Sequence, residues 1–149
     1  MGTRYKGTPE EIRALNTYIK LQRASESVIQ RTTHHLSNYN LTLSQFSALE
    51  ALYHLGTLSQ VEVAQKLLKS TGNITTVLKN LEKRDLITRQ RNEADNRYMD
   101  VVITQQGRDL IDSMLQKHIT GIADDMSTLT ADEQEELARL CKKLGLRSP

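Results

Sequence analysis

A helix-start signal, Ser/Thr-x-x-Glu/Gln, stands directly before a run of helically spaced apolar residues at four places in this chain. In such a capping box the hydroxyl accepts a hydrogen bond from the backbone three residues later, and the Glu or Gln side chain bonds back to the capping residue. The boxes begin at Thr8, Thr42, Ser59 and Thr130. A chain with these signals is predicted to be mainly helical.

A further helix follows the Ser59 helix after only a few residues. Ile74, Val77, Leu78 and Leu81 recur at helical spacing and therefore share one face. Short hydrogen-bonding side chains and lysines occupy the other face, which suits a helix lying against base edges and phosphates. These residues are Asn73, Thr75, Thr76, Lys79, Asn80 and Lys83.

Beyond Asp85 the apolar period changes from helical to two. Residues 86–91 and 98–103 are predicted strands, joined by the polar segment 92–97 into a hairpin. Thr104 can cap the next helix, which carries a broad apolar stripe from Leu110 to Met126. Gly145 is expected to end the last helix.

Charge is distributed unevenly along the chain. Residues 1–65 carry six Lys/Arg and five Asp/Glu, residues 66–97 carry eight and four, and residues 98–149 carry six and nine. The net charges are therefore +1, +4 and −3. A basic middle portion favours contact with a polyanion, although a solvated charged face is the plain alternative.

Several classes of protein are excluded by the sequence. The longest apolar runs are three residues, far short of the ~20 that cross a bilayer, and the N-terminus lacks a signal-peptide core. With one Cys no internal disulfide can form, so a cytoplasmic location is expected, with nucleoid association when bound to DNA. We find no Gly-rich phosphate loop, no Gly-x-Ser-x-Gly and no metal-ligand spacing. The sequence therefore predicts no enzyme, no catalytic residues, no metal and no cofactor.

The first and last helices lie far apart in the sequence, and each carries an apolar stripe that needs a partner. We expect these terminal helices to pack together and to leave surface for a second subunit. A symmetric dimer would present two basic lobes to two half-sites about one helical turn apart, roughly 34 Å.

Five segments, in order and with their spacing, resemble the MarR family of winged helix-turn-helix repressors. They are residues 59–64, 73–78, 81–87, 95–97 and 103–107, and the resemblance extends over about residues 10 to 145. It implies a homodimer with a recognition helix in the major groove and a wing at a flanking minor groove. It also implies a repressor of nearby genes that is released by a small, often phenolic, ligand.

Two positions depart from the family pattern. Asn96 stands where many members have a second Arg, which removes one possible phosphate or groove contact. Asp85 replaces a common Gly after the recognition helix, and because Asp tolerates left-handed backbone, the turn is expected to persist.

Candidate DNA-binding residues follow from this resemblance and from the helix faces. Ser70, Thr71 and Asn73 lie at the start of the recognition helix, where free N–H groups favour phosphate, or where they simply cap the helix. Thr75, Thr76, Lys79 and Asn80 are candidates for base or phosphate contact. Lys83 and Arg84 are expected to touch backbone phosphate.

The wing contributes the remaining candidates. Arg97 suits a minor groove, with Asp95 holding the wing by pairing with a nearby Arg; a purely structural Asp95–Arg97 turn pair is the alternative. Arg89 and Arg91 share one strand face and can follow phosphates, or they can protect a solvated strand edge.

An effector pocket is expected where the dimer region meets the DNA-binding lobe, because clefts form at such junctions. In the family it is bounded by the first, second and fifth helices. Packing at helix junctions is the alternative role for any one of its candidate residues. These ligand-binding candidates are Tyr18, His34, His35, Tyr39, Tyr53 and His54.

Two other chemically reactive side chains, Cys141 and His118, are expected to have structural roles. Cys141 occupies an apolar helical position and is expected to be a buried small hydrophobe, with redox sensing as the minor alternative. His118 lies within the stripe of the dimerisation helix and is expected to be an interface histidine with its polar atoms satisfied.

The sequence thus predicts a single subunit over residues 1–149, mainly α with a small β-hairpin wing (α+β). Residues 8–37 and 104–146 form the dimerisation region, and residues 42–103 form the winged helix-turn-helix lobe, with a recognition helix at about 70–84 and a wing at about 86–103. Its predicted partners are a pseudo-palindromic double-stranded DNA operator, a second copy of the chain and a small-molecule effector, with no membrane. The alternative is a winged-helix protein–protein interaction module, which the concentrated charge of +4 disfavours. RNA binding is disfavoured because the helix face lacks aromatic stacking residues.

Overall fold

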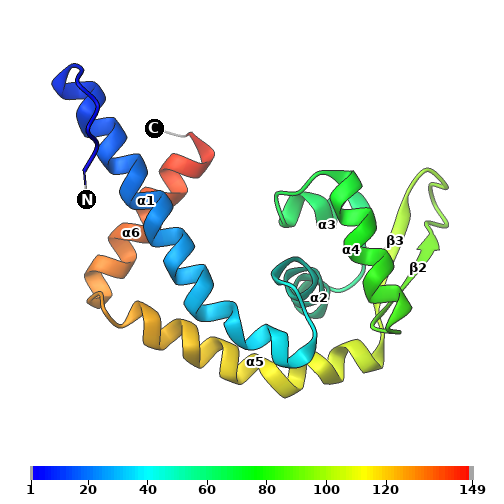
Figure 1. Cartoon of the computed structure of the whole chain (residues 1–149). Helices are drawn as coiled ribbons and strands as arrows, with labels where there is room; N and C mark the ends of the chain where they lie inside the picture. The colour runs from blue at the N-terminus through cyan, green and yellow to red at the C-terminus, as the bar shows by residue number, and fades with distance from the viewer. Residues whose placement is uncertain (1, 148–149) are drawn as a thin grey trace. The chain divides into compact units, whose positions relative to one another are not determined.

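The computed structural model of the chain describes residues 2–147. Six α-helices, one 3₁₀ helix and three short strands follow one another along this part of the chain (Figure 1). They are α1 (Pro9–Thr33), η1 (His34–Tyr39), α2 (Leu43–Leu55), β1 (Leu58–Ser59), α3 (Gln60–Lys66), α4 (Thr71–Lys83), β2 (Ile87–Arg91), β3 (Met99–Ile103), α5 (Gln105–Met126) and α6 (Ala131–Leu146). The predicted fold class, mainly α with a small β wing, is confirmed.

Local capping decides where these helices begin. At Thr8, Thr42, Ser59 and Thr130 both hydrogen bonds of the capping box are present, as predicted. Thr104 also acts as predicted, since its Oγ1 accepts the N–H of Gly107 at 3.0 Å. No helix within residues 2–147 is long and apolar enough to cross a membrane.

The structure differs from the expected elements in three places. The first α-helix ends at Thr33 and continues as the tighter η1, whose exit residue Asn40 has a positive φ of 53°. A short strand, β1, joins the expected hairpin as a third strand. The last helix runs through Gly145 and ends at Leu146, because Arg147 rather than Gly145 takes the left-handed conformation, with φ of 51°.

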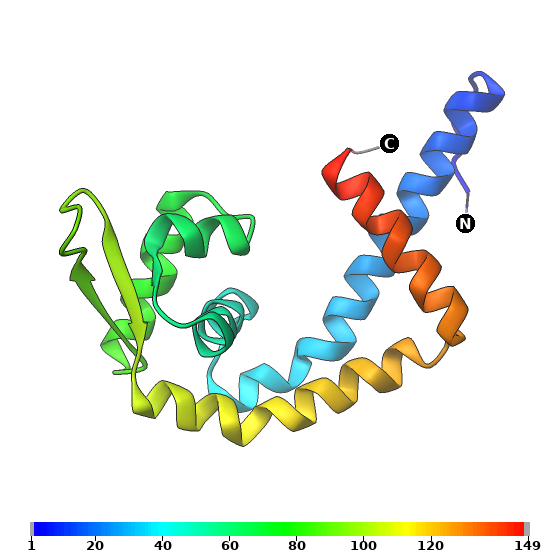
Figure 2. The same cartoon turned by 180° about the vertical axis from the view of Figure 1, so that it is seen from behind.

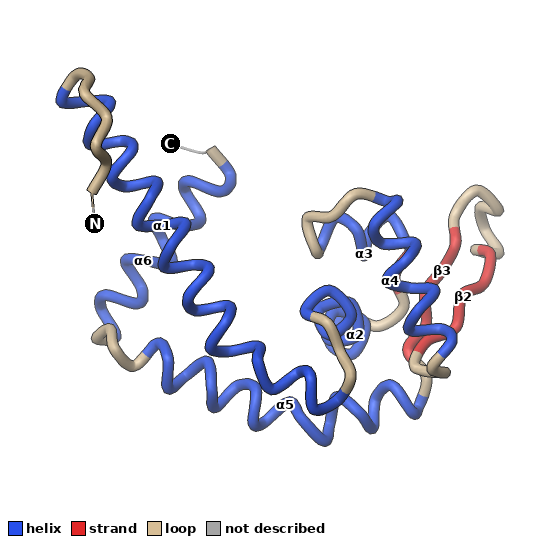
Figure 3. The backbone as a smooth tube through the Cα atoms, in the orientation of Figure 1, coloured by secondary structure: helices blue, strands red, loops and turns tan. Residues whose placement is uncertain are grey.

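The chain divides into two compact units, and the second boundary lies inside α5. Residues 35–117 form one unit, which we call the lobe. The other, which we call the terminal unit, comprises the described residues before 35 and after 117. Figure 3 shows the helices, strands and loops of both units along the backbone.

The lobe contains the hydrophobic core. Its helices α2, α3 and α4 pack against a three-stranded antiparallel sheet of order β1-β3-β2, in which Leu58 pairs with Val101 and Ile87 with Ile103. Phe46, the one phenylalanine, is fully buried. The largest of the other fully buried side chains are Leu49, Leu52, Ile74, Leu78, Leu81, Ile87, Ile111 and Met114.

A tight junction joins the end of α4 to the start of α5 within the lobe. Asp85 takes the left-handed conformation, with φ of 57°, which confirms the expected turn. Its carbonyl accepts the Thr104 hydroxyl at 2.6 Å, and the Leu86 carbonyl accepts the Thr104 N–H at 3.1 Å. Gly107 lies so close to Leu86 that an added Cβ would be 2.3 Å from its carbonyl oxygen. Glycine is therefore required where α5 passes the strand entry.

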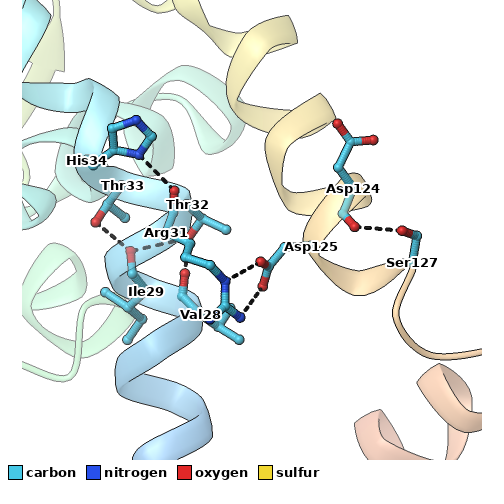
Figure 4. A network of polar contacts seen from close by, with 9 residues as sticks. All are labelled: Val28, Ile29, Arg31, Thr32, Thr33, His34, Asp124, Asp125 and Ser127. Carbon is cyan, nitrogen blue, oxygen red and sulfur yellow. Dashed lines mark hydrogen bonds and ion pairs between the residues drawn. The ribbon is translucent and has the colours of Figure 1, made fainter.

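In the terminal unit α6 crosses α1, as both Figures 1 and 2 show. Arg31 on α1 donates Nε and Nη2 hydrogen bonds to the two carboxylate oxygens of Asp125 on α5, at 2.5 and 3.0 Å (Figure 4). These bonds lower the pKa of Asp125 and raise that of Arg31. A bidentate pair of this kind fixes the orientation of one helix against the other.

Cys141 contradicts the expectation that it is buried. It is exposed on α6, beside the exposed leucines Leu137, Leu140 and Leu144. The apolar spacing of α6 is as predicted, but none of its residues is buried within one subunit. Apolar periodicity marks a face that can be covered, and it does not say whether the same chain covers it.

Candidate nucleic-acid interface

Helix α4 separates a buried face from an exposed polar face. Ile74, Leu78 and Leu81 are completely buried in the lobe. The opposite face is solvent-exposed at Asn73, Thr76, Lys79, Asn80 and Lys83, and Thr75 is half-buried. The exposed positions recur every three or four residues and so form one stripe along the helix. Such a stripe can reach base edges and phosphates together.

The start of α4 is capped by one of the three residues proposed there. Ser70 is the N-cap, and its Oγ accepts the N–H of Asn73 at 3.3 Å. Thr71 is the first residue of the helix. The side chain of Asn73 is exposed, so it can contact a ligand from the helix start.

Arg89 is directed into the lobe rather than toward solvent. Its Nε and Nη2 donate to the carboxylate oxygens of Glu82 at 2.8 and 3.3 Å, and its Nη1 donates to Gln60 Oε1 at 3.2 Å. Only 16% of the Arg89 side chain is exposed. The hydrogen bonds from Arg89 lower the pKa of Glu82. Arg89 therefore ties strand β2 to α4 and to the start of α3.

Arg84, the residue that caps the C-terminus of α4, makes a second connection at the same end of the helix. Its guanidinium donates to the backbone carbonyls of Asn40 at 2.6 Å and Tyr39 at 3.1 Å. The C-terminal end of α4 is thereby held to the turn between η1 and α2. These bonds engage the Arg84 guanidinium, which the sequence alone predicts to contact a backbone phosphate.

The tip of the wing is organised by one amide. Asn92 Oδ1 accepts the N–H groups of Ala94 and Asp95, both at 2.9 Å, and its Nδ2 donates to the Asp100 carboxylate at 2.9 and 3.2 Å. Asp95 in turn receives the Nε and Nη2 of Arg97, the latter at 2.7 Å. The hydrogen bonds from Arg97 lower the pKa of Asp95.

The two outermost wing arginines, Arg91 and Arg97, are both exposed to solvent. The Arg97 side chain is 83% exposed despite its pair with Asp95, and its guanidinium carbon lies 6.0 Å from the centre of the Tyr98 ring. Arg91 is exposed, and its Nη1 donates to the Asn96 carbonyl at 2.8 Å. The structure therefore brings the α4 stripe and a wing with an orientated, solvent-facing Arg97 into one lobe.

The predicted effector residues are distributed over both units. In the terminal unit, Tyr18 is exposed on α1, and His34 Nδ1 lies 2.9 Å from the Arg31 carbonyl (Figure 4). In the lobe, His35 is buried and Tyr39 is half-buried against the core. His118 is buried on α5, at the boundary of the terminal unit.

Tyr53 belongs to a polar cluster inside the lobe. Its hydroxyl donates to Asp112 Oδ1 at 2.5 Å, which raises the pKa of Tyr53. The Arg108 guanidinium carbon lies 6.0 Å from the centre of its ring, and His54 meets it edge-on at 5.0 Å. Within residues 2–147 no group of three or more His, Cys, Asp or Glu side chains is placed to hold a metal ion.

Sequence reasoning missed the partners that hold these side chains in place. Gln60, Glu82, Asp100 and Asp112 have no pattern of their own, because each meets its partner only through the fold. Asn92 had a local signal, since Asn favours turns in which its side chain accepts backbone N–H groups two and three residues later.

Comparison with known proteins extends these observations. A MarR family model matches residues 41–98, which span most of the lobe. YkoM of Bacillus subtilis, an uncharacterized HTH-type transcriptional regulator, is 31% identical over 140 residues and aligns with 93% of this chain and 91% of its own.

Two solved structures share the fold at 25% identity. Staphylococcus aureus MepR in complex with DNA has a TM-score of 0.76, covering 87% of this chain and 96% of its own. Bordetella bronchiseptica BpsR, studied for the regulation of its DNA binding by 6-hydroxynicotinic acid, has a TM-score of 0.78, covering 87% of this chain and 98% of its own.

Proposed function

The chain belongs to the MarR family of winged helix-turn-helix transcriptional regulators, and from that membership we propose that it is a homodimeric repressor released from its operator by a small molecule. DNA binding and transcriptional regulation follow from the family. The observation that supports DNA binding by this surface is the exposed polar stripe of α4, in the same lobe as a wing that presents Arg97 to solvent.

We assign the DNA-facing candidates to two roles. Direct contact is proposed for side chains that are exposed on α4 and the wing, and for Thr71 and Thr75 by their position on α4. Arg84, Arg89 and Asp95 are proposed to position α4 and the wing, since their charged groups are engaged within the lobe. Ser70 is proposed to cap the recognition helix and to present its first N–H groups to a phosphate. The direct set is Asn73, Thr76, Lys79, Asn80, Lys83, Arg91 and Arg97, with Thr71 and Thr75.

A second copy of the chain is the proposed partner of the terminal unit. Large apolar side chains of all three of its helices are at least a third exposed in one subunit. Leaving so many in water is unfavourable, at roughly 25 cal/mol per Å². They are Tyr18, Leu21 and Ile29 on α1, Ile119 and Ile122 on α5, and Leu137, Leu140, Leu144 and Leu146 on α6.

A small organic effector is proposed because BpsR, which shares this fold at 25% identity, was studied for regulation of its DNA binding by 6-hydroxynicotinic acid. The proposed ligand-binding residues are those given by the sequence: Tyr18, His34, His35, Tyr39, Tyr53 and His54. Among them, Tyr53 donates a hydrogen bond to the Asp112 carboxylate and lies beside Arg108. A hydroxylated, anionic ligand can replace Asp112 as the partner of the Tyr53 hydroxyl.

The test starts from selection of tight-binding sequences out of a library of randomised 30-base-pair duplexes by the purified full-length chain. The selected duplex is then titrated at two salt concentrations, and the mass of the complex is measured by sedimentation. We expect a pseudo-palindrome with half-site centres about one helical turn apart, bound by one dimer with strong salt dependence. Equal, weak binding to all duplexes would contradict the proposal and favour a protein-interaction module.

A further inference from the structure

The turn between α3 and α4 holds a leucine side chain in solvent. Leu68 is 93% exposed, the highest value among the large apolar side chains of the described residues. It follows Leu67, which packs against the core of the lobe. Leu68 therefore contributes almost no burial to the fold.

The backbone at Leu68 is also unfavourable for a leucine. Its φ is +53°, in the left-handed region where a Cβ crowds the following carbonyl oxygen. The Leu68 N–H donates to the Gln65 carbonyl at 3.2 Å, and the Lys69 N–H donates to the Ala64 carbonyl at 3.0 Å, which closes the C-terminus of α3. Glycine or asparagine usually occupies this position in such helix ends. The protein thus bears backbone strain at a residue whose apolar side chain is almost wholly exposed within the subunit.

The surroundings of Leu68 are basic and adjoin the DNA-facing helix. Lys66 and Lys69 are exposed on either side of it, and Ser70, the N-cap of α4, comes two residues later. An open groove of about 590 Å³ separates this turn from α2, where Glu50 lies on the opposite wall. The positive charges on this groove, from Lys66 and Lys69, therefore lie on the side of the α3–α4 turn.

We propose that Leu68 is a DNA contact, whose side chain packs against deoxyribose and thymine methyl groups while Lys66 and Lys69 neutralise the adjoining phosphates. Thymine methyls are the apolar feature of the major groove, and lysines supply the salt-dependent part of binding. Strain of this kind is retained where it serves a site. The inference rests on the proposed function, because it extends the surface formed by α4.

A protein partner is the other conceivable occupant of an exposed leucine. Two features favour DNA: the two lysines that flank Leu68, and the continuity of the turn with the polar stripe of α4. A protein contact would need an acidic partner at the place where the duplex itself is expected.

The test compares five variants of the full-length chain by fluorescence anisotropy on the duplex selected as above. Leu68→Gly and Leu68→Asn both suit left-handed backbone and both remove the apolar side chain. Leu55→Asn is the matched control, because Leu55 is another exposed leucine on the far wall of the same groove. Lys79→Ala reports on the recognition helix and hence on the proposed function.

We expect both Leu68 variants to bind about tenfold more weakly, with the salt slope unchanged because no charge is lost. Leu68→Gly should at the same time raise the melting temperature by about 2–4 °C, because backbone strain is relieved. A double Lys66→Gln, Lys69→Gln variant should lower the salt slope by about two. Weaker binding by a more stable protein cannot be explained by misfolding.

Wild-type affinity in both Leu68 variants would overturn the inference, and if Lys79→Ala still weakens binding, the proposed function survives. An equal loss in Leu55→Asn would also overturn it, because the effect would then belong to the groove as a whole. If the wild-type chain selects no duplex, the inference and the proposed function fail together.

Discussion

Replacing Gly107 by alanine tests whether the α4–α5 junction is as tightly packed as the structure shows. The new Cβ would lie 2.3 Å from the Leu86 carbonyl oxygen and 2.8 Å from Ile103 Cγ1, whereas ordinary van der Waals contact begins at 3.4 Å. To remove this clash, the new Cβ and the Leu86 carbonyl oxygen must move apart by about 1 Å. The Leu86 carbonyl is main chain and accepts the Thr104 N–H, so it cannot rotate away as a flexible side chain would.

The magnitude follows from three contributions. Overpacking of a well-filled site costs about 1–3 kcal/mol, and a rigid backbone neighbour favours the upper half of that range. Weakening the hydrogen bond from Thr104 to Leu86 adds about 1 kcal/mol. Alanine returns about 0.5–1 kcal/mol through its higher helix propensity. We therefore expect Gly107→Ala to lose about 2–3.5 kcal/mol of unfolding free energy and roughly 4–14 °C in melting temperature.

Urea denaturation followed by circular dichroism measures this loss. The matched control is Gly121→Ala in the same helix, where an added Cβ meets nothing within 4 Å, and Gly72→Ala gives a second open site in the lobe. Both controls should be neutral or slightly stabilising. A Gly107→Ala protein as stable as its controls would refute the close approach of α5 to Leu86.

Three further perturbations test the lobe and its wing. Glu82→Gln should lower the unfolding free energy by roughly 0.5–1 kcal/mol at pH 7, a small value because Glu82 is partly exposed. Hydrogen bonds from Arg89 lower the pKa of Glu82 from 4.5, so the pair stabilises the fold above that pH and this stability is lost as Glu82 protonates. Denaturation between pH 7 and 3 should therefore show the deficit of the variant vanish, whereas a deficit that stays constant would point to packing. Asn92→Ala should loosen the wing tip and speed proteolysis there several-fold with little change in melting temperature, because only three local hydrogen-bond partners are lost. An unchanged cleavage rate would show that the wing tip keeps its conformation without the Asn92 side chain. Arg97→Ala should weaken duplex binding and lower the salt slope by about one, and an unchanged slope would assign Arg97 a purely structural role.

Local sequence signals were sufficient for most of the secondary structure. A capping box joins residues three apart, and an amphipathic stripe is a property of one helix, so both could be recognised without knowing the fold. The exposed stripe of α4 follows from the same reasoning, since Ile74, Leu78 and Leu81 must face the core. The strand β1 was not predicted, because a strand of only two residues, Leu58 and Ser59, shows no alternation of apolar and polar side chains.

The roles of the arginines depended on the tertiary structure. Arg84, Arg89, Arg91 and Arg97 are all candidates for DNA contact in the sequence, with a structural turn pair as the alternative for Arg97 and a charged strand edge as the alternative for Arg89 and Arg91. The fold directs Arg84 to carbonyls 44 and 45 residues away and Arg89 to Gln60, 29 residues away, whereas Arg97 pairs two residues away and stays exposed. The side chain gives no indication of which partner the fold will bring near.

The sequence by itself determined the helix starts, the change of period at the wing, the basic middle segment and the family resemblance. Only the tertiary structure decided that Cys141 is exposed, that Asn92 organises the wing tip and that Leu68 is held in strained backbone. The physical reason is range. Capping and amphipathicity act within a few residues, whereas burial and ion pairing depend on which distant segments come together when the core forms.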